Sequence, residues 1–531
     1  MWGLSLTSAL LLSIPWLVPH TGIVALVALV PLLCADYIAS GAGIRHFWRW
    51  HYFTFVLWNA ITTFWVCNAT VGGGIFAVLA NALQMSLVFG LFRLAKKRLT
   101  GVLPYIFLAA AWIAWERWYL VSAEISWPWL VLGNAFAASV RDVQWYSVTG
   151  TLGGSLWVWC SNLGLFGLLV SVAGGRWKNW NVRIRTVVPV VLSLVVVGPI
   201  ICSTIMYNSY VEHSEGKVEV VIGQPNLDPY QKFTSMKQSD QTGLLLGLYR
   251  RELANGPADL LLAPETFCSD VILNDISISP TWQAFNGFLE DYPGTDILFG
   301  AATNELFYTR SAPGLLSYPW GNGWRVPHNS AIMLGKEGRT EVFHKSKLVV
   351  GTELTPYPKV FVPLDNWLSR TFGNGSPMMA RDSGQDEISL LHLDDSTALG
   401  CAVCYESVYG EYCTDYVRKG ASFLAVITND SWWGNTPGYR QHLSYSCLRA
   451  IELRRDIARC GNSGISCFID QKGDILKQGP WWEEAVLRGS VNLNTDQSFF
   501  ARYGDIAGRF CSLVFLLLLA LILVRLLTRK K

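Results

Sequence analysis

Three positions of the chain carry side chains that together could perform acyl transfer. Glu265 stands directly after the apolar run 260–263, Cys404 directly after the apolar run 398–403, and Lys345 in a polar segment between them. A thiol can attack an ester or amide carbonyl, a carboxylate can take the thiol proton, and an ammonium group can stabilise the developing oxyanion. Because open α/β sheets carry their sites at the carboxyl ends of strands, the sequence predicts a thiol acyl-transfer site here.

The same residues also have plainer interpretations. Cys401 and Cys404 have the Cys-x-x-Cys spacing of a redox pair or of half a zinc site. A zinc site with four ligands needs a second pair, and the sequence shows none at ligand spacing, so we expect neither a metal nor another cofactor. Glu265 alone could be a solvated carboxylate or one near a helix N-terminus. We predict that Cys404 is a free thiol, since a disulfide would remove the nucleophile.

Composition places these residues in a membrane protein. Of the 531 residues, 51% are hydrophobic and only 15% are charged, against about 25% charged in an average soluble protein. The first 206 residues hold four acidic and twelve basic side chains and 16 of the 24 tryptophans, whereas the remainder is net acidic. Runs rich in Lys and Arg lie only in short loops between apolar segments, so we do not expect a nucleic-acid partner.

Eight apolar segments have about the length that a helix needs to cross a bilayer. We expect them near residues 3–18, 21–39, 51–69, 72–92, 101–119, 152–174, 186–206 and 508–527. They predict a transmembrane domain with seven helices over 1–206, an extramembrane domain over 207–507, and a last transmembrane helix with a basic cytoplasmic tail over 508–531. The first segment could instead be a cleaved signal peptide, but it lacks a basic start and a small-residue cleavage site.

Loop charges predict the orientation, because Lys and Arg accumulate on the cytoplasmic side of a membrane. Basic side chains gather in four places, at residues 45–49, 93–98, 176–185 and 529–531. All four fall on one side if the chain crosses eight times and its N-terminus is cytoplasmic. The block 207–507 then lies outside the cytoplasmic membrane.

The extramembrane block has the pattern of one α/β domain. Short runs rich in Val, Ile, Leu and Ala suit strands that are covered on both faces. These runs are 218–222, 260–263, 296–301, 330–334, 398–403, 423–428 and 464–469. Helical candidates such as 242–254 and 442–455 lie between them, which favours a layered sheet.

The order of Glu265, Lys345 and Cys404 resembles that of the nitrilase superfamily, and the flanking membrane segments make the chain similar to the bacterial apolipoprotein N-acyltransferases. The resemblance covers nearly the whole chain. It includes Gly223-Gln224-Pro225-Asn226, Cys404-Tyr405-Glu406, Asn429-Asp430-Ser431-Trp432-Trp433-Gly434, Gln441-His442, Arg449-Ala450-Ile451-Glu452, Asn462-Ser463-Gly464, Trp127-Pro128-Trp129-Leu130 and Arg502-Tyr503-Gly504-Asp505. It implies a nitrilase-like α-β-β-α sandwich for the extramembrane domain.

The resemblance also implies an activity, that of a phospholipid:apolipoprotein N-acyltransferase with two half-reactions. An acyl chain would pass from a phospholipid to a thioester on the cysteine, and then to the α-amine of the N-terminal diacylglyceryl cysteine of a lipoprotein. The expected partners are the phospholipid donor, the diacylglyceryl-modified apolipoprotein acceptor and membrane lipid. The expected location is the bacterial inner membrane, with several spans and a periplasmic catalytic domain, and we expect a monomer.

The resemblance assigns a role to six residues of this sequence. Cys404 is the nucleophile, Glu265 its base and Lys345 the cation for the oxyanion. Glu353, Tyr405 and Glu406 are expected to support the site or to contact substrate, and a purely structural Glu406 stays open. The family often has Leu-Val-Pro-Phe-Gly-Glu where this chain has residues 348–353, so the spacing from the lysine to the glutamate is kept although the loop differs.

Two other functions stay open at this point. A membrane-tethered nitrilase-type amidase would hydrolyse a small amide with the same three residues, although eight spans exceed what a tether needs. A transporter or scaffold would not need them, but transporters usually place ionisable groups within spans. Aromatic and Pro-rich segments at 318–320 and 355–361 could form lids toward lipid or ordinary surface loops.

Overall fold

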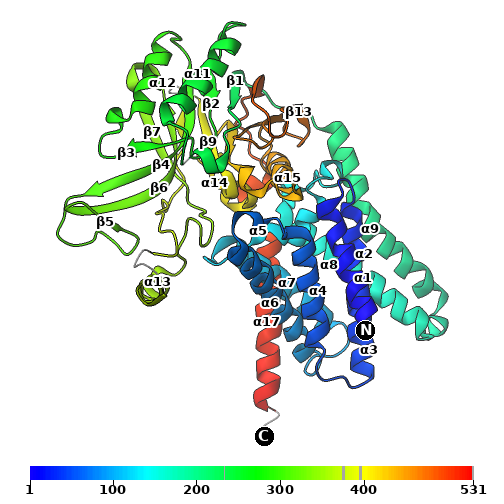
Figure 1. Cartoon of the computed structure of the whole chain (residues 1–531). Coiled ribbons are helices and arrows are strands. Elements are labelled where there is room, and N and C mark those ends of the chain that lie inside the picture. The colour runs from blue at the N-terminus through cyan, green and yellow to red at the C-terminus, as the bar shows by residue number, and fades with distance from the viewer. Residues whose placement is uncertain (233, 373–376, 394–396, 529–531) are drawn as a thin grey trace.

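The computed structural model describes residues 1–232, 234–372, 377–393 and 397–528, and the basic tail residues Arg529, Lys530 and Lys531 lie outside them. The beginning and the end of the chain form a helical bundle, and the residues between them form an α/β part above it (Figure 1). The last helix, α17 (Ile506–Thr528), packs against α7 (Leu103–Val121) of the bundle. The two ends of the chain therefore build one helical unit.

The other helices of the bundle are α1 (Trp2–Leu17), α2 (Ala25–Ala28), α3 (Val30–Gly41), α4 (Trp48–Thr63), α5 (Val66–Ala69), α6 (Val71–Ala95), α8 (Tyr146–Ala173) and α9 (Val182–Ser209). Five segments of the described chain are long and apolar enough to cross a membrane. They are Gly22–Gly41, Val71–Ala95, Tyr146–Ala173, Val182–Ser209 and Ile506–Thr528.

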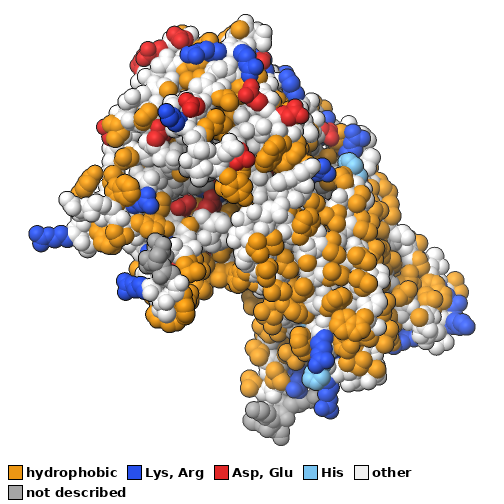
Figure 2. All heavy atoms as spheres, in the orientation of Figure 1, with side chains coloured by type: hydrophobic (Ala, Val, Ile, Leu, Met, Phe, Trp, Pro, Cys, Tyr) orange, Lys and Arg blue, Asp and Glu red, His pale blue; other side chains and the backbone are white. Residues whose placement is uncertain are grey.

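The structure has helix at all eight positions where a span was predicted. Three of these eight helices are not among the five segments above. α1 and α4 have 16 residues each, and the 19-residue α7 carries Glu116 and Arg117. Length and apolarity alone therefore support five spans. α9 and α17 bury only 11% of their most apolar windows within the protein, and Figure 2 shows the apolar surface that covers this half of the molecule.

Two sheets form the α/β part. The first contains β1 (Lys217–Gln224), β2 (Leu260–Leu262), β3 (Cys268–Ile272), β4 (Asp296–Phe307), β5 (Tyr318–Trp320), β6 (Gly323–Leu334), β7 (Thr340–His344) and β14 (Ala485–Asn492). The second contains β8 (Leu391–His392), β9 (Ala398–Val403), β10 (Phe423–Thr428), β11 (Ile457–Gly461), β12 (Cys467–Ile469) and β13 (Ile475–Gln478).

The strand order is β14-β1-β2-β4-β6-β5 in the first sheet, with β3 beside β4 and β7 beside β6, and β13-β12-β11-β10-β9-β8 in the second. β1, β2 and β4 run parallel, as do β9, β10 and β11. Parallel strands are usually covered on both faces, and every residue of β2 and β10 is indeed buried. All seven predicted runs overlap a strand.

The two sheets pack face to face between two layers of helices. Val220, Leu262 and Met333 of the first sheet share an apolar core with Leu399 and Val426 of the second. The outer face of the first sheet is covered by α11 (Gln238–Leu253) and α12 (Pro280–Glu290), and that of the second by α14 (Gly410–Arg418) and α15 (Pro437–Leu453). Shorter or peripheral helices are α10 (Pro229–Lys232), α13 (Pro358–Phe372) and α16 (Phe499–Tyr503).

α15 also joins the α/β part to the helical bundle. Oε1 of its Gln441 accepts hydrogen bonds from the indole nitrogens of Trp129, at 2.7 Å, and Trp65, at 3.3 Å. At the other end of the helix, Glu452 accepts a 2.8 Å bond from the backbone nitrogen of Thr151. Because buried polar groups need partners, these bonds fix the second sheet on top of the bundle.

Candidate active site

Glu265, Lys345 and Cys404 come from three strand ends. Glu265 lies three residues after β2, Lys345 directly follows β7, and Cys404 directly follows β9. β2 and β7 belong to the first sheet and β9 to the second, so the site lies where strand ends of both sheets meet. All three residues are buried, with 5%, 1% and 9% of their surface exposed. The structure thus brings together the three residues that the sequence singled out.

The Lys345 ammonium is the centre of a buried charge cluster. Its Nζ lies 2.8 Å from Oε1 of Glu265 and 2.8 Å from Oε1 of Glu353. Asn329 in β6 donates to the same two oxygens, at 2.9 Å and 2.8 Å. The second oxygen of Glu265 accepts from the backbone nitrogen of Asn429 at 3.1 Å. Charge-assisted bonds of this kind hold both carboxylates in fixed orientations.

The charges of the cluster set the protonation state of the three residues. Burial alone would raise the pKa of Glu265, but the Lys345 charge and the hydrogen bonds from Lys345 and Asn329 lower it. Burial would lower the pKa of Lys345, but Glu265 and Glu353 raise it well above its usual value. Burial and then the Glu265 charge raise the pKa of the Cys404 thiol. The resting site therefore holds a carboxylate, an ammonium and a thiol.

Cys404 has a backbone conformation that is unusual for a residue with a side chain. Its φ is +52°, in the left-handed region, at the start of the short 3-10 helix Cys404–Val408. This sharp change of direction after β9 leaves the buried thiol close enough to Glu265 for the carboxylate charge to raise its pKa. All twelve cysteines of the chain lie in the described part and are free, so the prediction of a free Cys404 agrees with the structure.

Glu406 is a fully buried carboxylate that links two loops of the site. Its Oε1 accepts from the backbone nitrogens of Ser346, at 2.7 Å, and Lys347, at 3.2 Å, and its Oε2 from that of Val403 at 2.8 Å. Burial raises its pKa, and the hydrogen bonds oppose that rise. Glu406 therefore holds the segment after Lys345 beside the segment before Cys404.

Tyr405 points from the nucleophile toward the helical bundle. Its hydroxyl donates to the carbonyl of Ser126 at 3.2 Å, and its ring stacks on Trp127 with the ring centres 6.1 Å apart.

Glu353 has a second function besides holding Lys345, because its Oε2 accepts from the backbone nitrogen of Val349 at 2.8 Å. That bond closes the loop between the lysine and the glutamate.

Two residues beside Glu265 were not predicted from the sequence to belong to the site. Asn329, which donates to both Glu265 and Glu353, lies directly before the predicted run 330–334 and has no sequence signal of its own. Gly300 in β4 lies so close to the chain at Glu265 that a Cβ there would be 2.6 Å from the Glu265 Cα. Only glycine allows this approach, so Gly300 helps to set the position of the carboxylate.

A row of buried, hydrogen-bonded polar side chains lies behind Cys404 and was also not predicted as part of the site. The carbonyl oxygen of Cys404 lies 3.0 Å from Nε2 of His442, and Nδ1 of His442 lies 2.9 Å from Oδ1 of Asp430. Arg459 in β11 donates to the other oxygen of Asp430 at 2.8 Å. The position of Asp430 just after β10 was a useful sequence signal. The strand that contains Arg459, β11, was not predicted because this charge interrupts its apolar run.

The sulfur of Cys404, a ring nitrogen of His442 and a carboxylate oxygen of Asp430 lie within 4.8 Å of one another. Three such groups could in principle hold a metal ion. The oxygens of Asp430 and the nitrogens of His442 are already bonded, and the buried Arg459 would repel a divalent cation. The donor set therefore fits a hydrogen-bonded chain, and we assign no metal to it.

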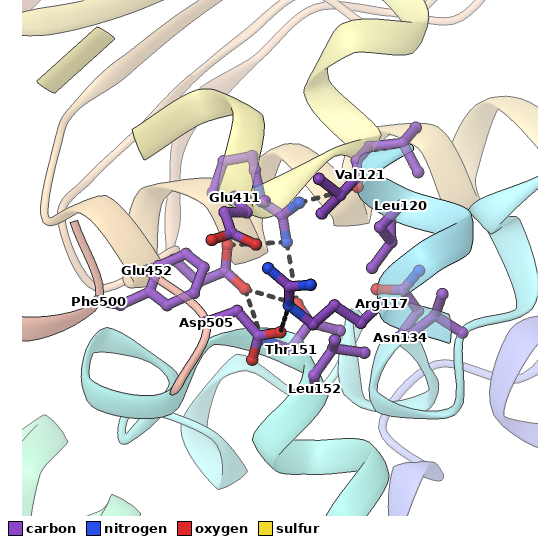
Figure 3. A pocket seen from close by; sticks show the side chains of 14 residues that line it. Arg117, Leu120, Val121, Asn134, Thr151, Leu152, Glu411, Glu452, Phe500 and Asp505 are labelled. Atoms are coloured by element: carbon purple, nitrogen blue, oxygen red, sulfur yellow. Dashed lines mark hydrogen bonds and ion pairs between the residues drawn. The ribbon is translucent and has the colours of Figure 1, made fainter. Parts of the chain in front are cut away.

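A hollow of about 380 Å³, part of it open to solvent and lined by both charged and apolar side chains, lies between α7, α8, α14 and α15 (Figure 3). Arg449 and Glu452 form an ion pair of 3.0 Å in its wall, and Arg117 lies 3.7 Å from Asp505. The residues that line it include none of the three predicted catalytic side chains. We therefore treat this hollow as part of the junction between the two halves of the chain.

α13 projects from the α/β part on the same side as the bundle (Figure 1). It exposes Val360, Leu364 and Trp367, with 62%, 43% and 56% of their surface accessible. Figure 2 shows a recess between this projection and the helical bundle. The predicted lid segment 355–361 enters α13, so its apolar residues lie at the edge of this recess.

Comparison with known proteins links both halves of the chain to one type of protein. The carbon-nitrogen hydrolase profile matches residues 251–499, and the profile of the apolipoprotein N-acyltransferase N-terminal domain matches residues 8–164. An apolipoprotein N-acyltransferase from Chlorobaculum tepidum is 28% identical over 515 residues, which cover 96% of this chain and 94% of that protein.

Two further relatives carry the same name. The apolipoprotein N-acyltransferase of Geobacter metallireducens is 28% identical over 85% of this chain and 80% of its own length. That of Pasteurella multocida is 28% identical over 74% of this chain and 70% of its own length. The similarity thus spans the helical bundle and the α/β part alike.

Proposed function

The chain belongs to the apolipoprotein N-acyltransferase family, and we propose that it transfers an acyl chain from a phospholipid, through a thioester on Cys404, to the α-amine of the N-terminal diacylglyceryl cysteine of a lipoprotein. The observation that carries this proposal is the buried cluster in which Glu265 accepts from the Lys345 ammonium and acts with its charge on the buried Cys404 thiol. The apolar helices below it support the proposal, since both substrates carry acyl chains.

In the first half-reaction the thiol of Cys404 attacks the ester carbonyl of the phospholipid while its proton passes to Glu265. A free thiol has a pKa of about 8.5 and is mostly protonated at neutral pH. The Glu265 carboxylate, whose charge acts on the thiol, is the base at the point of attack. The Lys345 ammonium stabilises the oxyanion. Collapse breaks the ester C–O bond, and the departing lysophospholipid takes the proton from Glu265.

In the second half-reaction the amine of the lipoprotein attacks the thioester carbonyl. An α-amine has a pKa of about 8 and must be neutral to attack. Glu265, a carboxylate again after the first step, takes a proton from the attacking nitrogen. The C–S bond breaks, the amide is formed, and the Cys404 thiolate regains its proton from Glu265.

Glu353, Tyr405 and Glu406 support the three catalytic residues in this proposal. Glu353 shares the Lys345 ammonium with Glu265, and Glu406 ties the lysine loop to the nucleophile loop. Tyr405 connects the nucleophile to the bundle through Ser126. The burial of the site also limits water, which would hydrolyse the thioester.

We propose eight membrane crossings in a bacterial inner membrane, with the α/β part on the periplasmic side and the chain acting as a monomer. The division into a transmembrane domain over 1–206, a catalytic domain over 207–507 and a last span with its tail over 508–531 follows the same proposal. Basic residues support this orientation, because Arg93 and Lys96 pair with Asp36 of α3, and α3 lies at the end of the bundle away from the α/β part (Figure 1).

The lipid substrates would approach through the recess beside α13. α13 exposes Val360, Leu364 and Trp367. Side chains of this kind insert into the interfacial region of a bilayer. Both substrates could then reach the site without leaving the membrane. Apart from those two lipid-bearing substrates and the surrounding membrane lipid, the proposal requires no other partner and no cofactor.

The decisive experiment incubates the purified full-length protein, in detergent micelles, with a dipalmitoyl phospholipid alone. We expect a palmitoyl adduct on the peptide that contains Cys404, detected by mass spectrometry, and its transfer to a synthetic diacylglyceryl-cysteinyl peptide added afterwards. Cys404→Ala should abolish the adduct and Glu265→Ala should nearly do so. Cys467→Ala, which removes a buried thiol in β12, is the matched control and should keep it.

The same experiment separates the two other functions. No adduct, together with rapid release of ammonia from small amides, would favour a membrane-tethered amidase. A cellular role that survives both Cys404→Ala and Glu265→Ala would favour a transporter or scaffold and would contradict the enzyme proposal.

A further inference from the structure

Lys347 carries a positive charge that the acyl-transfer steps described above do not use. It stands two residues after Lys345, in the loop 345–353. Its ammonium nitrogen lies over the rings of Tyr409 and Tyr412, 5.4 Å and 5.6 Å from the ring centres. Within the part of the chain that the structure describes, no carboxylate oxygen lies within 4.0 Å of this nitrogen and no hydrogen-bond acceptor is paired with it.

The surroundings of this ammonium group suit an anionic ligand. Burial lowers the pKa of Lys347, and the charge of Glu406 opposes that shift. Glu406 does not pair with the ammonium, because its two oxygens accept from backbone nitrogens, including those of Ser346 and Val403. The tyrosine rings attract a cation only through their faces. A half-buried ammonium group without a carboxylate therefore leaves room for a charge-assisted bond to an anion from outside the chain.

Tyr409 places Lys347 on the side of the site that faces the helical bundle. The Tyr409 hydroxyl lies 2.9 Å from that of Ser126, in the loop that follows α7. Burial raises the pKa of Tyr409 to about 12, and the charge of Lys345 opposes the rise, so the same tyrosine also lies within reach of the catalytic lysine. Lys347 thus lies between the reacting groups and the top of the bundle.

The start of α13 reaches the same loop of the bundle. Glu124, two residues before Ser126, accepts a hydrogen bond from the backbone nitrogen of Tyr357, which directly precedes α13. The recess through which the lipid substrates would approach lies between α13 and the bundle (Figure 2). Lys347 therefore lies near the place where α13, the bundle and the catalytic site meet.

The chemistry of the two proposed substrates differs at this distance from the nucleophile. In a phospholipid, one glycerol unit separates the anionic phosphate from the ester carbonyls. Two residues of extended chain span at most about 7 Å, so a donor with its ester at Cys404 and Lys345 can place its phosphate near Lys347. The diacylglyceryl group of the acceptor has the same esters but no phosphate. A cation at this position would therefore favour the donor in the first half-reaction.

We propose that Lys347 binds the phosphate of the phospholipid donor, so that the catalytic site selects a phosphate-bearing lipid over a neutral diacylglyceryl group. This inference rests on the proposed acyl transfer from a phospholipid. Lys347 does not touch the reacting carbonyl, and it changes the affinity for the donor and not the chemical step.

The test uses two lipids that bind but cannot react. A dialkyl ether phospholipid has the phosphate but no ester carbonyl, and a dialkylglycerol with the same chains lacks both. Each lipid is added at increasing mole fraction to the full-length protein in detergent micelles. Iodoacetamide then alkylates Cys404, and mass spectrometry of the peptide that contains Cys404 gives the rate. A lipid that occupies the site slows this alkylation, so the readout is the mole fraction that gives half-maximal protection.

Three variants are compared with the wild type. Lys347→Met keeps a long side chain between the tyrosine rings but removes the charge, whereas Lys347→Arg keeps the charge. Lys237→Met is the matched control, because it removes an exposed lysine at the start of α11, on the outer layer of the α/β part.

We expect the ether phospholipid to protect the wild type at a mole fraction roughly 10- to 100-fold lower than the dialkylglycerol does, as a charge-assisted bond implies. In Lys347→Met this ratio should fall to about one, whereas Lys347→Arg and Lys237→Met should keep most of it. A loss of packing alone would weaken both lipids equally and leave the ratio unchanged.

A wild type in which the two lipids protect equally, or in which neither protects, would overturn the inference, and this result decides even if Lys347→Met fails to fold. A wild-type ratio in Lys347→Met would also overturn it. Protection by inorganic phosphate alone would assign the site to a free anion and contradict a lipid phosphate. Protection needs no acyl transfer, so a wild type that forms no acyl adduct with an ester phospholipid would overturn the proposed function instead.

Discussion

The ammonium nitrogen of Lys345 lies 2.8 Å from Oε1 of Glu265 and 2.8 Å from Oε1 of Glu353. One buried cation thus serves two carboxylates, and Asn329 donates to both of them. Breaking a buried ion pair leaves an uncompensated charge and costs about 3–5 kcal/mol, so the cation and the base are fixed before substrate arrives. This preorganisation is what stabilisation of an oxyanion requires.

The first prediction concerns Glu353. Glu353→Gln removes one of the two charges that hold Lys345, so the ammonium should shift toward Glu265 and away from the position of the oxyanion. We expect adduct formation on Cys404 to slow by roughly 10- to 100-fold, measured as a single-turnover rate by mass spectrometry. Glu387→Gln removes a carboxylate whose side chain is 87% exposed, and it should react like the wild type. Equal rates in the two variants would refute this role of Glu353.

The second prediction concerns Glu406. In the wild type, backbone N–H groups donate to the Glu406 carboxylate. Glu406→Gln places an amide NH₂ group, which is itself a donor, against them. Loss of hydrogen bonds to a buried charge should lower the free energy of unfolding by about 2–3 kcal/mol, seen as a lower midpoint of thermal unfolding in micelles. Tyr412→Phe removes only one donor to Glu406 and should cost about 1 kcal/mol. A Glu406→Gln protein as stable as Tyr412→Phe would argue against the link that Glu406 makes between the lysine loop and the nucleophile loop.

The third prediction concerns pH and Asp382. Burial, and then the Glu353 charge, raise the pKa of Asp382 from 3.8 to about 7. The folded state therefore binds a proton that the unfolded chain has lost, and stability falls as the pH rises from about 4 to about 7. Asp382→Asn cannot ionise, so it should be more stable than the wild type at pH 8 by about 2–4 kcal/mol and similar to it near pH 4.

Thermal unfolding of both proteins in the same micelles at several pH values checks this result. The other acidic groups are common to the two proteins, so their titrations cancel in the difference between midpoints. A difference that stays constant between pH 5 and pH 8 would mean that Asp382 has an ordinary pKa in the folded protein.

The fourth prediction concerns orientation. Tyr308→Cys introduces a thiol at a residue of the α/β part that is 79% exposed, and Asn179→Cys introduces one in the exposed basic segment before α9. In intact spheroplasts we expect a membrane-impermeant maleimide to label only Tyr308→Cys. Asn179→Cys should react only after the membrane is permeabilised, and the reverse pattern would exclude a periplasmic α/β part.

Much of the site was predictable because its three main residues follow strands with a strong apolar pattern. β2 and β9 are buried parallel strands, and their apolar runs end at the point where Glu265 and Cys404 begin the next segment. Lys345 and Glu353 were predictable only by resemblance, because a lysine and a glutamate in a polar loop have no pattern of their own. β11 was missed because Arg459 interrupts its apolar run, and only its pairing with Asp430 explains a charge there.

The sequence by itself determined the apolar segments, the buried strands and the order of the three reactive residues, since these depend on hydrophobic patterns that neighbouring residues share. Only the tertiary structure decided that Asn329 joins Glu265 to Glu353 and that His442 lies behind Cys404. These contacts join residues 24 to 64 positions apart. A hydrogen bond over such a distance depends on how the sheets and helices pack, which leaves no periodic trace along the chain.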